Sequence, residues 1–98
     1  MKVRSLLNLE SYLFFECIKF NKVEDAVYLI NQDKKLLFDF DYSGQTCYHW
    51  AAKRNYHELL RELINFGKHV NLYDNKRRTP LFLAVENNHY ESAKILLE

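Results

Sequence analysis

Four histidines and two cysteines raise the possibility of a zinc site. Cys47 and His49 lie two positions apart, so on a helix their side chains point to different faces. The sequence has no C-x-x-C or H-x-x-x-H pair, and such pairs are usual spacings of zinc ligands. We therefore expect neither a metal site nor a cofactor.

The carboxylates and glycines do not indicate catalysis either. The carboxylates expected on outer helix faces are Glu24, Asp25, Glu58, Glu62 and Glu91. Residues at neighbouring positions do not combine into a nucleophile with an adjacent base. The two glycines, Gly44 and Gly67, are too few for a phosphate-binding Gly-rich loop. We therefore expect no catalytic residue and no enzyme activity within this chain.

Charge and hydropathy restrict the function further. The 98 residues allow one compact domain, and 14 basic against 13 acidic residues leave a formal net charge of +1. This balance does not favour nucleic acid or a membrane surface as partner. No apolar run approaches the roughly 20 residues that span a bilayer, and the two cysteines form no disulfide framework. We expect a soluble, cytoplasmic protein with reduced core thiols and no membrane insertion.

A repeat organises the chain and must position any functional side chain. Residues 46–52 read TCYHWAA, and residues 79–85, 33 positions later, read TPLFLAV. The apolar spacing predicts two helices in the first unit, at about residues 47–54 and 56–66. Helices this short are marginal alone, so their stability must come from stacking on neighbouring units. The period therefore predicts a stack of helical pairs.

The unit that begins at residue 41 resembles an ankyrin repeat, a 33-residue unit of a β-turn and two antiparallel helices. The matching residues are Asp41, Gly44, Thr46, His49, Ala51, Ala52, Glu58, Leu60, Leu63, Gly67, Val70 and Asn71. The resemblance implies an all-α ankyrin-repeat solenoid of stacked helix-turn-helix units with short β-turn hairpins. We expect one domain over residues 1–98, made of a degenerate capping repeat (1–40), a full repeat (41–73) and an incomplete third repeat (74–98).

Individual residues of the full repeat have expected local roles. Gly44 fits a turn position that needs a positive φ, and the Thr46 hydroxyl can cap the following helix. Gly67 can end the second helix in a left-handed conformation. In the family, the histidine at the position of His49 makes hydrogen bonds near the turn, so we expect a structural role for it.

The third repeat departs from the pattern at two positions. Arg77 stands where a turn glycine is usual, and Phe82 stands where the histidine is usual. A residue with a β-carbon fills the glycine position at a cost, so we expect the second turn to be slightly strained or differently wound. Phe82 cannot make the hydrogen bonds of a histidine.

Large side chains at helical spacing are expected to form the core between helices and repeats. They are Phe14, Phe15, Ile18, Val27, Ile30, Trp50, Leu60, Leu63, Leu81, Leu83 and Leu96. With Trp50 in this core, the substitution Trp50→Ala would cost roughly 3 to 5 kcal/mol.

The resemblance also implies a contact surface, because partners of ankyrin domains usually lie against the concave side made by turn tips and the ends of the first helices. The positions carried over are Phe40, Tyr42, Ser43, Gln45, Lys53, Arg54, Tyr73, Asn75, Lys76, Arg77, Arg78, Glu86 and Asn87, with Phe20 and Asn21 from the first repeat. Five of these are cations beside three aromatic anchors. The local positive charge favours an acidic segment of a protein partner and is a poor track for nucleic acid.

Two classes of function remain open at this point. One is a protein-protein interaction module without catalysis. The other is a structural subunit built permanently into a large intracellular assembly, for example a cytoskeletal or ciliary one, or the non-catalytic ankyrin part of a longer enzyme or channel. Leu96 and Leu97 would leave an apolar seam uncovered, so we expect further repeats or another subunit to cover the C-terminal end.

Overall fold

The computed structural model describes residues 9–69 and 71–98. These residues form three helical pairs and one short 3-10 helix, without a strand among them. The pairs are α2 (Leu9–Lys19) with α3 (Val23–Gln32), α4 (Cys47–Lys53) with α5 (His57–Phe66), and α6 (Pro80–Glu86) with α7 (Tyr90–Leu97); the 3-10 helix η1 (Lys34–Phe38) follows α3. The expected all-α solenoid of stacked helical pairs is confirmed.

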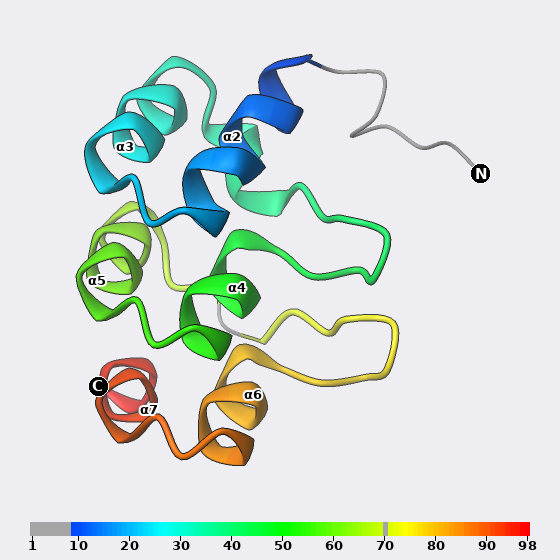
Figure 1. Ribbon diagram of the computed structural model, residues 1–98, viewed down its shortest axis with the longest axis vertical. Helices are drawn as coiled ribbons and strands as arrows, with labels where there is room; N and C mark the ends of the chain where they lie inside the picture. Colours follow the sequence, from blue (N-terminus) through cyan, green and yellow to red (C-terminus); the bar gives the residue numbers. More distant parts are fainter. Residues whose placement is uncertain (1–8, 70) are drawn as a thin grey trace.

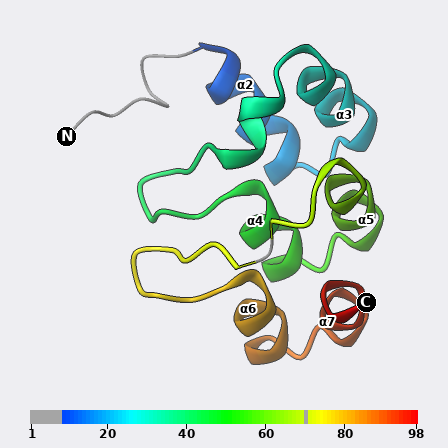
Figure 2. The ribbon, with the colours of Figure 1, turned by 180° about the vertical axis from the view of Figure 1, so that it is seen from behind.

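The first helices of the pairs, α2, α4 and α6, form one row, and the second helices, α3, α5 and α7, form another (Figure 1). The row of first helices packs through contacts of α4 with α2 and α6, and the second row through contacts of α5 with α3 and α7. Two long turns, before α4 and before α6, project from the first row on the side away from the second row (Figure 2). The turns and the first helices therefore share one side of the molecule.

The core lies between the two rows and runs through all three pairs. Eight of the eleven side chains expected there are buried, namely Phe14, Phe15, Ile18, Ile30, Leu60, Leu63, Leu83 and Leu96. Val27, Leu81 and Trp50 are only partly buried. Trp50 and Leu81 pack against the core without being fully buried, and the surroundings of Trp50 are described with the site below.

Polar contacts at the corners of the helical pairs tie each repeat to the one before it. The Tyr56 hydroxyl donates to the Lys19 carbonyl at 2.9 Å, and His89 Nδ1 donates to the Ala52 carbonyl at 3.1 Å. Both carbonyls lie in the last turn of a first helix, and the Ala52 carbonyl also accepts from the Asn55 N–H at 3.3 Å. The helix ends of one repeat are thus capped by side chains of the next.

The end of α5 differs from its expected form. Gly67 has a φ of 170°, which is extended backbone, so the expected left-handed conformation at this position is wrong. The fully buried Tyr48 hydroxyl lies within hydrogen-bond distance of the Leu63 and Gly67 carbonyls. The Leu63 carbonyl also accepts from the Gly67 N–H at 3.3 Å, so the hydroxyl from α4 is a second donor at this helix end.

Candidate functional site: the turns and the first helices

The two turns have the same hydrogen bonds, 33 residues apart. Asp41 Oδ1 accepts from the N–H groups of Ser43 (2.9 Å) and Gln45 (3.0 Å). Asp74 Oδ1 accepts in the same way from the N–H groups of Lys76 (2.9 Å) and Arg78 (2.8 Å). An aspartate side chain thus folds each turn locally, as aspartate commonly does.

Gly44 and Arg77 occupy equivalent positions in these turns, and both have a positive φ, +77° and +63° respectively. The N–H of each donates to the carbonyl of the turn's aspartate at 2.9 Å. The second turn is therefore wound like the first, and the expected alternative of a different winding is wrong. Arg77 takes a left-handed conformation that costs an L-residue about 1 to 2 kcal/mol.

The turns also stack directly on each other. The Asn75 N–H donates to the Ser43 carbonyl at 2.8 Å, and Asn75 Nδ2 donates to the Tyr42 carbonyl at 2.9 Å. A β-carbon on Gly44 would lie 2.9 Å from Asn75 N, which is too close. Gly44 is therefore required both by its φ and by the approach of the following turn.

His49 is buried between the two turns and has the structural role expected of it. His49 Nδ1 accepts from the Thr46 N–H at 3.1 Å in a capping box, so the ring proton is on Nε2, which donates to the Arg78 carbonyl at 2.8 Å. Burial lowers the pKa of His49 and keeps the ring neutral. The ring thus joins the start of α4 to the following turn.

Asp74 is the polar centre of the contact between the turns, and its side chain is fully buried. Asp74 Oδ2 accepts from Arg78 Nε at 2.9 Å and from Gln45 Nε2 at 3.1 Å. Burial alone would raise the pKa of Asp74, but hydrogen bonds from the Arg78 N–H, the Gln45 amide and the Arg78 guanidinium outweigh it and lower the pKa to about 2. The carboxylate is therefore ionised and holds both turns together.

Gln45 is not the solvent-facing residue that the sequence predicted. It is 3% exposed because the following turn covers it, and its Oε1 accepts from Lys53 Nζ at 2.8 Å. Arg78 is partly buried and forms an ion pair with Asp74. Both side chains bind Asp74 and stabilise the contact between the turns. Gln45 is therefore not part of the exposed contact surface, and Arg78 belongs to the turn itself.

The other positions expected on the contact surface are accessible to different degrees. Lys53 is partly buried, and Asn21 and Phe20 of the first repeat are exposed. The remaining residues are exposed as well, and they are Phe40, Tyr42, Ser43, Arg54, Tyr73, Asn75, Lys76, Arg77, Glu86 and Asn87. The turn tips carry most of them, on the side where α4 and α6 begin (Figure 1).

Trp50 and three cations form a cluster that the sequence analysis missed, here called the Trp50 cluster. Lys53 Nζ lies 4.0 Å from the centroid of the Trp50 ring, the Arg54 guanidinium carbon 5.0 Å and Lys19 Nζ 5.4 Å. Trp50 Nε1 donates to Asp41 Oδ2 at 2.9 Å, which fixes the ring. Lys53 and Arg54 follow Trp50 by three and four positions, and this helical spacing could have indicated their contacts with the ring. Nothing in the sequence pattern indicated Lys19.

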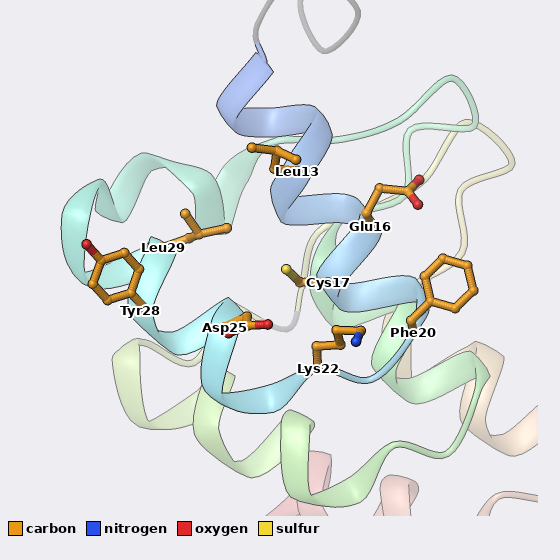
Figure 3. A pocket seen from close by; sticks show the side chains of 8 residues that line it. All are labelled: Leu13, Glu16, Cys17, Phe20, Lys22, Asp25, Tyr28 and Leu29. Atoms are coloured by element: carbon orange, nitrogen blue, oxygen red, sulfur yellow. The ribbon is translucent and has the colours of Figure 1, made fainter.

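A pocket lies in the first helical pair, between α2 and α3 (Figure 3). Its walls mix apolar side chains with Glu16, Lys22 and Asp25, and Cys17 lies between the two helices. Burial and the nearby Asp25 carboxylate raise the pKa of Cys17, so the thiol stays protonated and is a poor nucleophile. The pocket therefore has no arrangement that indicates catalysis.

The described residues also lack two features that would indicate other functions. No three His, Cys, Asp or Glu side chains among them are grouped to hold a metal ion. No helix among them has the length and apolar character needed to cross a membrane.

Comparison with known proteins matches residues 14–98 to the family model of ankyrin repeats, in three copies. The chain is 36% identical over 59 residues to NF-kappa-B inhibitor cactus of Drosophila melanogaster, which covers 59% of the chain and 12% of cactus. It is 35% identical over 81 residues to an ankyrin repeat protein of fowlpox virus, covering 78% of the chain and 12% of that protein. It is 35% identical over 49 residues to human NF-kappa-B inhibitor zeta, covering 50% of the chain and 7% of that protein.

The chain thus corresponds to 12% or less of the length of these relatives. The family match begins within α2 and extends over the other five helices and both turns. Ankyrin repeats are a protein-protein interaction module. The stacked pairs, the two equivalent turns and the family match together show that this chain belongs to the ankyrin-repeat family.

Proposed function

We propose that this chain binds an acidic segment of a protein partner through the side formed by its turns and first helices. The main support is a set of cations without an acidic partner of their own. Lys19, Lys53, Arg54, Lys76 and Arg77 lie on this side, and no ion pair joins any of them to a carboxylate in the described part of the chain. Arg61 and Arg78, in contrast, both form ion pairs.

The carboxylates nearest to these cations are already used within the fold. Asp41 accepts from two backbone N–H groups and from the Trp50 ring, and Asp74 accepts from the second turn, Gln45 and Arg78. Both carboxylates keep their charge, but the five cations outnumber them, so the local charge is positive although the whole chain has a net charge of only +1. Complementary charge on a partner raises the rate of encounter and fixes its orientation.

Exposed aromatic side chains at the turns add apolar contact area to this surface. Tyr42 is 69% exposed and Tyr73 67% exposed, and both lie within two residues of a turn aspartate. Tyrosine is enriched in protein interfaces because its ring is apolar and its hydroxyl can form hydrogen bonds. Two relatives are named as inhibitors of NF-kappa-B, which fits a binding role for this chain too. The free thiols Cys17 and Cys47 fit a reducing, intracellular location.

Site-specific photo-crosslinking tests this proposal. A photoreactive phenylalanine derivative placed at Tyr73 should capture a protein from an extract of the source cells, and the captured peptide should be rich in Asp and Glu. The same group at Tyr90, which is 80% exposed on α7, is the matched control and should not capture that protein. Raising the salt concentration should weaken capture at Tyr73 because it screens exposed charges.

Two results would count against the proposal. Capture at Tyr90 in preference to Tyr73 would place the contact surface on the second helices. Capture at Tyr73 that survives high salt would contradict an electrostatic contact and favour a subunit built permanently into an assembly.

A further inference from the structure

We infer that the Trp50 cluster binds a carboxylate side chain of the acidic partner segment, with Lys53 and Arg54 as the contacting cations. This inference rests on the proposed function and assigns its anchoring site. The cluster consists of Trp50, Lys53 and Arg54 from α4 and Lys19 from the end of α2. It therefore joins the first helices of two neighbouring repeats.

The first argument is that three like charges converge on one ring. All three cationic groups lie within 5.4 Å of the centroid of the Trp50 ring. The ring attracts each cation, but such contacts at exposed sites contribute only about 0.5 to 1 kcal/mol. They do not neutralise the positive charges. The Asp41 carboxylate already binds the ring N–H, but the three cations outnumber it. A further anion among them would reduce the remaining repulsion and would form charge-assisted hydrogen bonds with them.

The second argument is that the cluster is held in position before any partner binds. Lys53 Nζ donates to Gln45 Oε1 at 2.8 Å, and Gln45 is itself buried and bound to Asp74. The hydrogen bond from Trp50 Nε1 to Asp41 fixes the ring. Burial lowers the pKa of Lys53; the Asp41 carboxylate opposes this shift, and the nearby charge of Arg54 adds to it. Preorganised groups lose less entropy on binding.

The third argument concerns the chemical class of the ligand. Single-stranded nucleic acid binds by stacking bases on the open faces of aromatic rings. The Trp50 ring is instead covered by Lys53, whose ammonium nitrogen lies 4.0 Å from the ring centroid. Because a cation occupies the ring face, the face is not open for stacking with a base. The site therefore favours a small anionic group on a protein chain, such as an Asp or Glu carboxylate.

Trp50 is the only tryptophan of the chain, so its fluorescence reports on this site alone. The full chain is titrated with a dye-labelled hexaglutamate peptide at low salt. The anisotropy of the dye gives the affinity, and the Trp50 emission shows whether the peptide reaches the cluster. We expect saturable binding with a change in emission, and we expect about threefold to tenfold weaker binding for Lys53→Gln and for Arg54→Gln.

A control that removes two charges elsewhere separates the cluster from general attraction. The double variant Lys34→Gln with Lys94→Gln removes two exposed charges on η1 and α7 and should bind with unchanged affinity. Arg54 is exposed, so Arg54→Gln should keep the helical circular dichroism of the parent chain and its thermal midpoint. This variant therefore tests the site without loss of the fold.

Three results would overturn the inference. If Lys76→Gln with Arg77→Gln weakens hexaglutamate binding while Lys53→Gln and Arg54→Gln do not, the anchor lies at the turn tip and the proposed function still stands. If oligothymidine binds more tightly than hexaglutamate, the ligand class is wrong. If hexaglutamate does not bind at low salt, the carboxylate site is absent, and the crosslinking at Tyr73 decides separately whether the surface binds a protein.

Discussion

Substitution of Asp74 by asparagine removes the charge from the centre of the contact between the turns while keeping the shape of the side chain. The carboxylate accepts four hydrogen bonds, from Lys76 N–H, Arg78 N–H, Arg78 Nε and Gln45 Nε2. An asparagine has one oxygen and one NH2 group, so one side of this arrangement becomes donor against donor. We expect a loss of stability from both the missing charge and the mismatched hydrogen bonds.

The pKa of Asp74 gives the size of the charge contribution. The folded chain has a pKa of about 2 at this group, against an ordinary value of 3.8. Since one pKa unit corresponds to about 1.4 kcal/mol, ionised Asp74 contributes about 2 kcal/mol at neutral pH. Its side chain is fully buried, so solvent screens this contribution little. The mismatched hydrogen bonds add about 1 kcal/mol, and Asp74→Asn should lose about 3 kcal/mol in total.

The pH dependence separates the two contributions. Because the folded pKa of Asp74 is lower than the unfolded one, the stabilisation is complete above about pH 5 and is lost as the pH falls towards 2. Between pH 6 and pH 3 the parent chain should lose about 1 kcal/mol at this group, and Asp74→Asn should lose none there. The difference in unfolding free energy between the two proteins should therefore shrink by about 1 kcal/mol at pH 3.

Urea denaturation followed by far-UV circular dichroism at pH 6 and pH 3 measures this difference. Asp33→Asn is the control, because Asp33 accepts a single backbone hydrogen bond, from the Lys35 N–H at 3.1 Å, at an exposed helix start. It should cost about 1 kcal/mol or less. A difference for Asp74→Asn that is equal at both pH values would show that the carboxylate charge does not stabilise the turns.

Three further substitutions test the turns and the core by the same denaturation measurement. Gly44→Ala should cost at least about 2 kcal/mol, because the residue has a φ of +77° and the new β-carbon would lie 2.9 Å from Asn75 N. Arg77→Gly should instead stabilise the chain by up to about 1 kcal/mol, since it relieves a positive φ at an exposed position; a loss of stability would refute the equivalence of the two turns. Tyr48→Phe should cost about 1 to 2 kcal/mol, because the Leu63 carbonyl loses a buried donor 3.1 Å away, and a cost near zero would contradict the capping of α5.

The sequence was sufficient for the repeat and for most of the core because both depend on local periodicity. The helical spacing of Leu60 and Leu63 placed both on one face of α5, and both are buried. The positive φ of Gly44 followed in the same way from the residue type and its place in a turn. These features are determined within one repeat.

Two of the differences from expectation concern positions whose surroundings come partly from another repeat. Gln45 is buried by the turn that contains Asp74, which lies 29 residues later. Trp50 and Leu83 occupy equivalent positions, yet Leu83 is 1% exposed whereas Trp50 is only partly buried. The indole has a polar N–H that bonds to Asp41, and it is covered by cations from two helices. No periodicity within the sequence distinguishes these two environments.

The contacts between the repeats also connect the turns to the Trp50 cluster. Asp74 binds Gln45, Gln45 binds Lys53, and Lys53 lies over the ring of Trp50, which in turn binds Asp41 of the first turn. The position of a cation on the second helical pair therefore depends on a carboxylate that belongs to the third. A solenoid is stabilised by contacts between neighbouring repeats, and here the same contacts set the geometry of an exposed group. It follows that the candidate binding surface is a property of adjacent repeats together, and that a single repeat of this chain would not reproduce it.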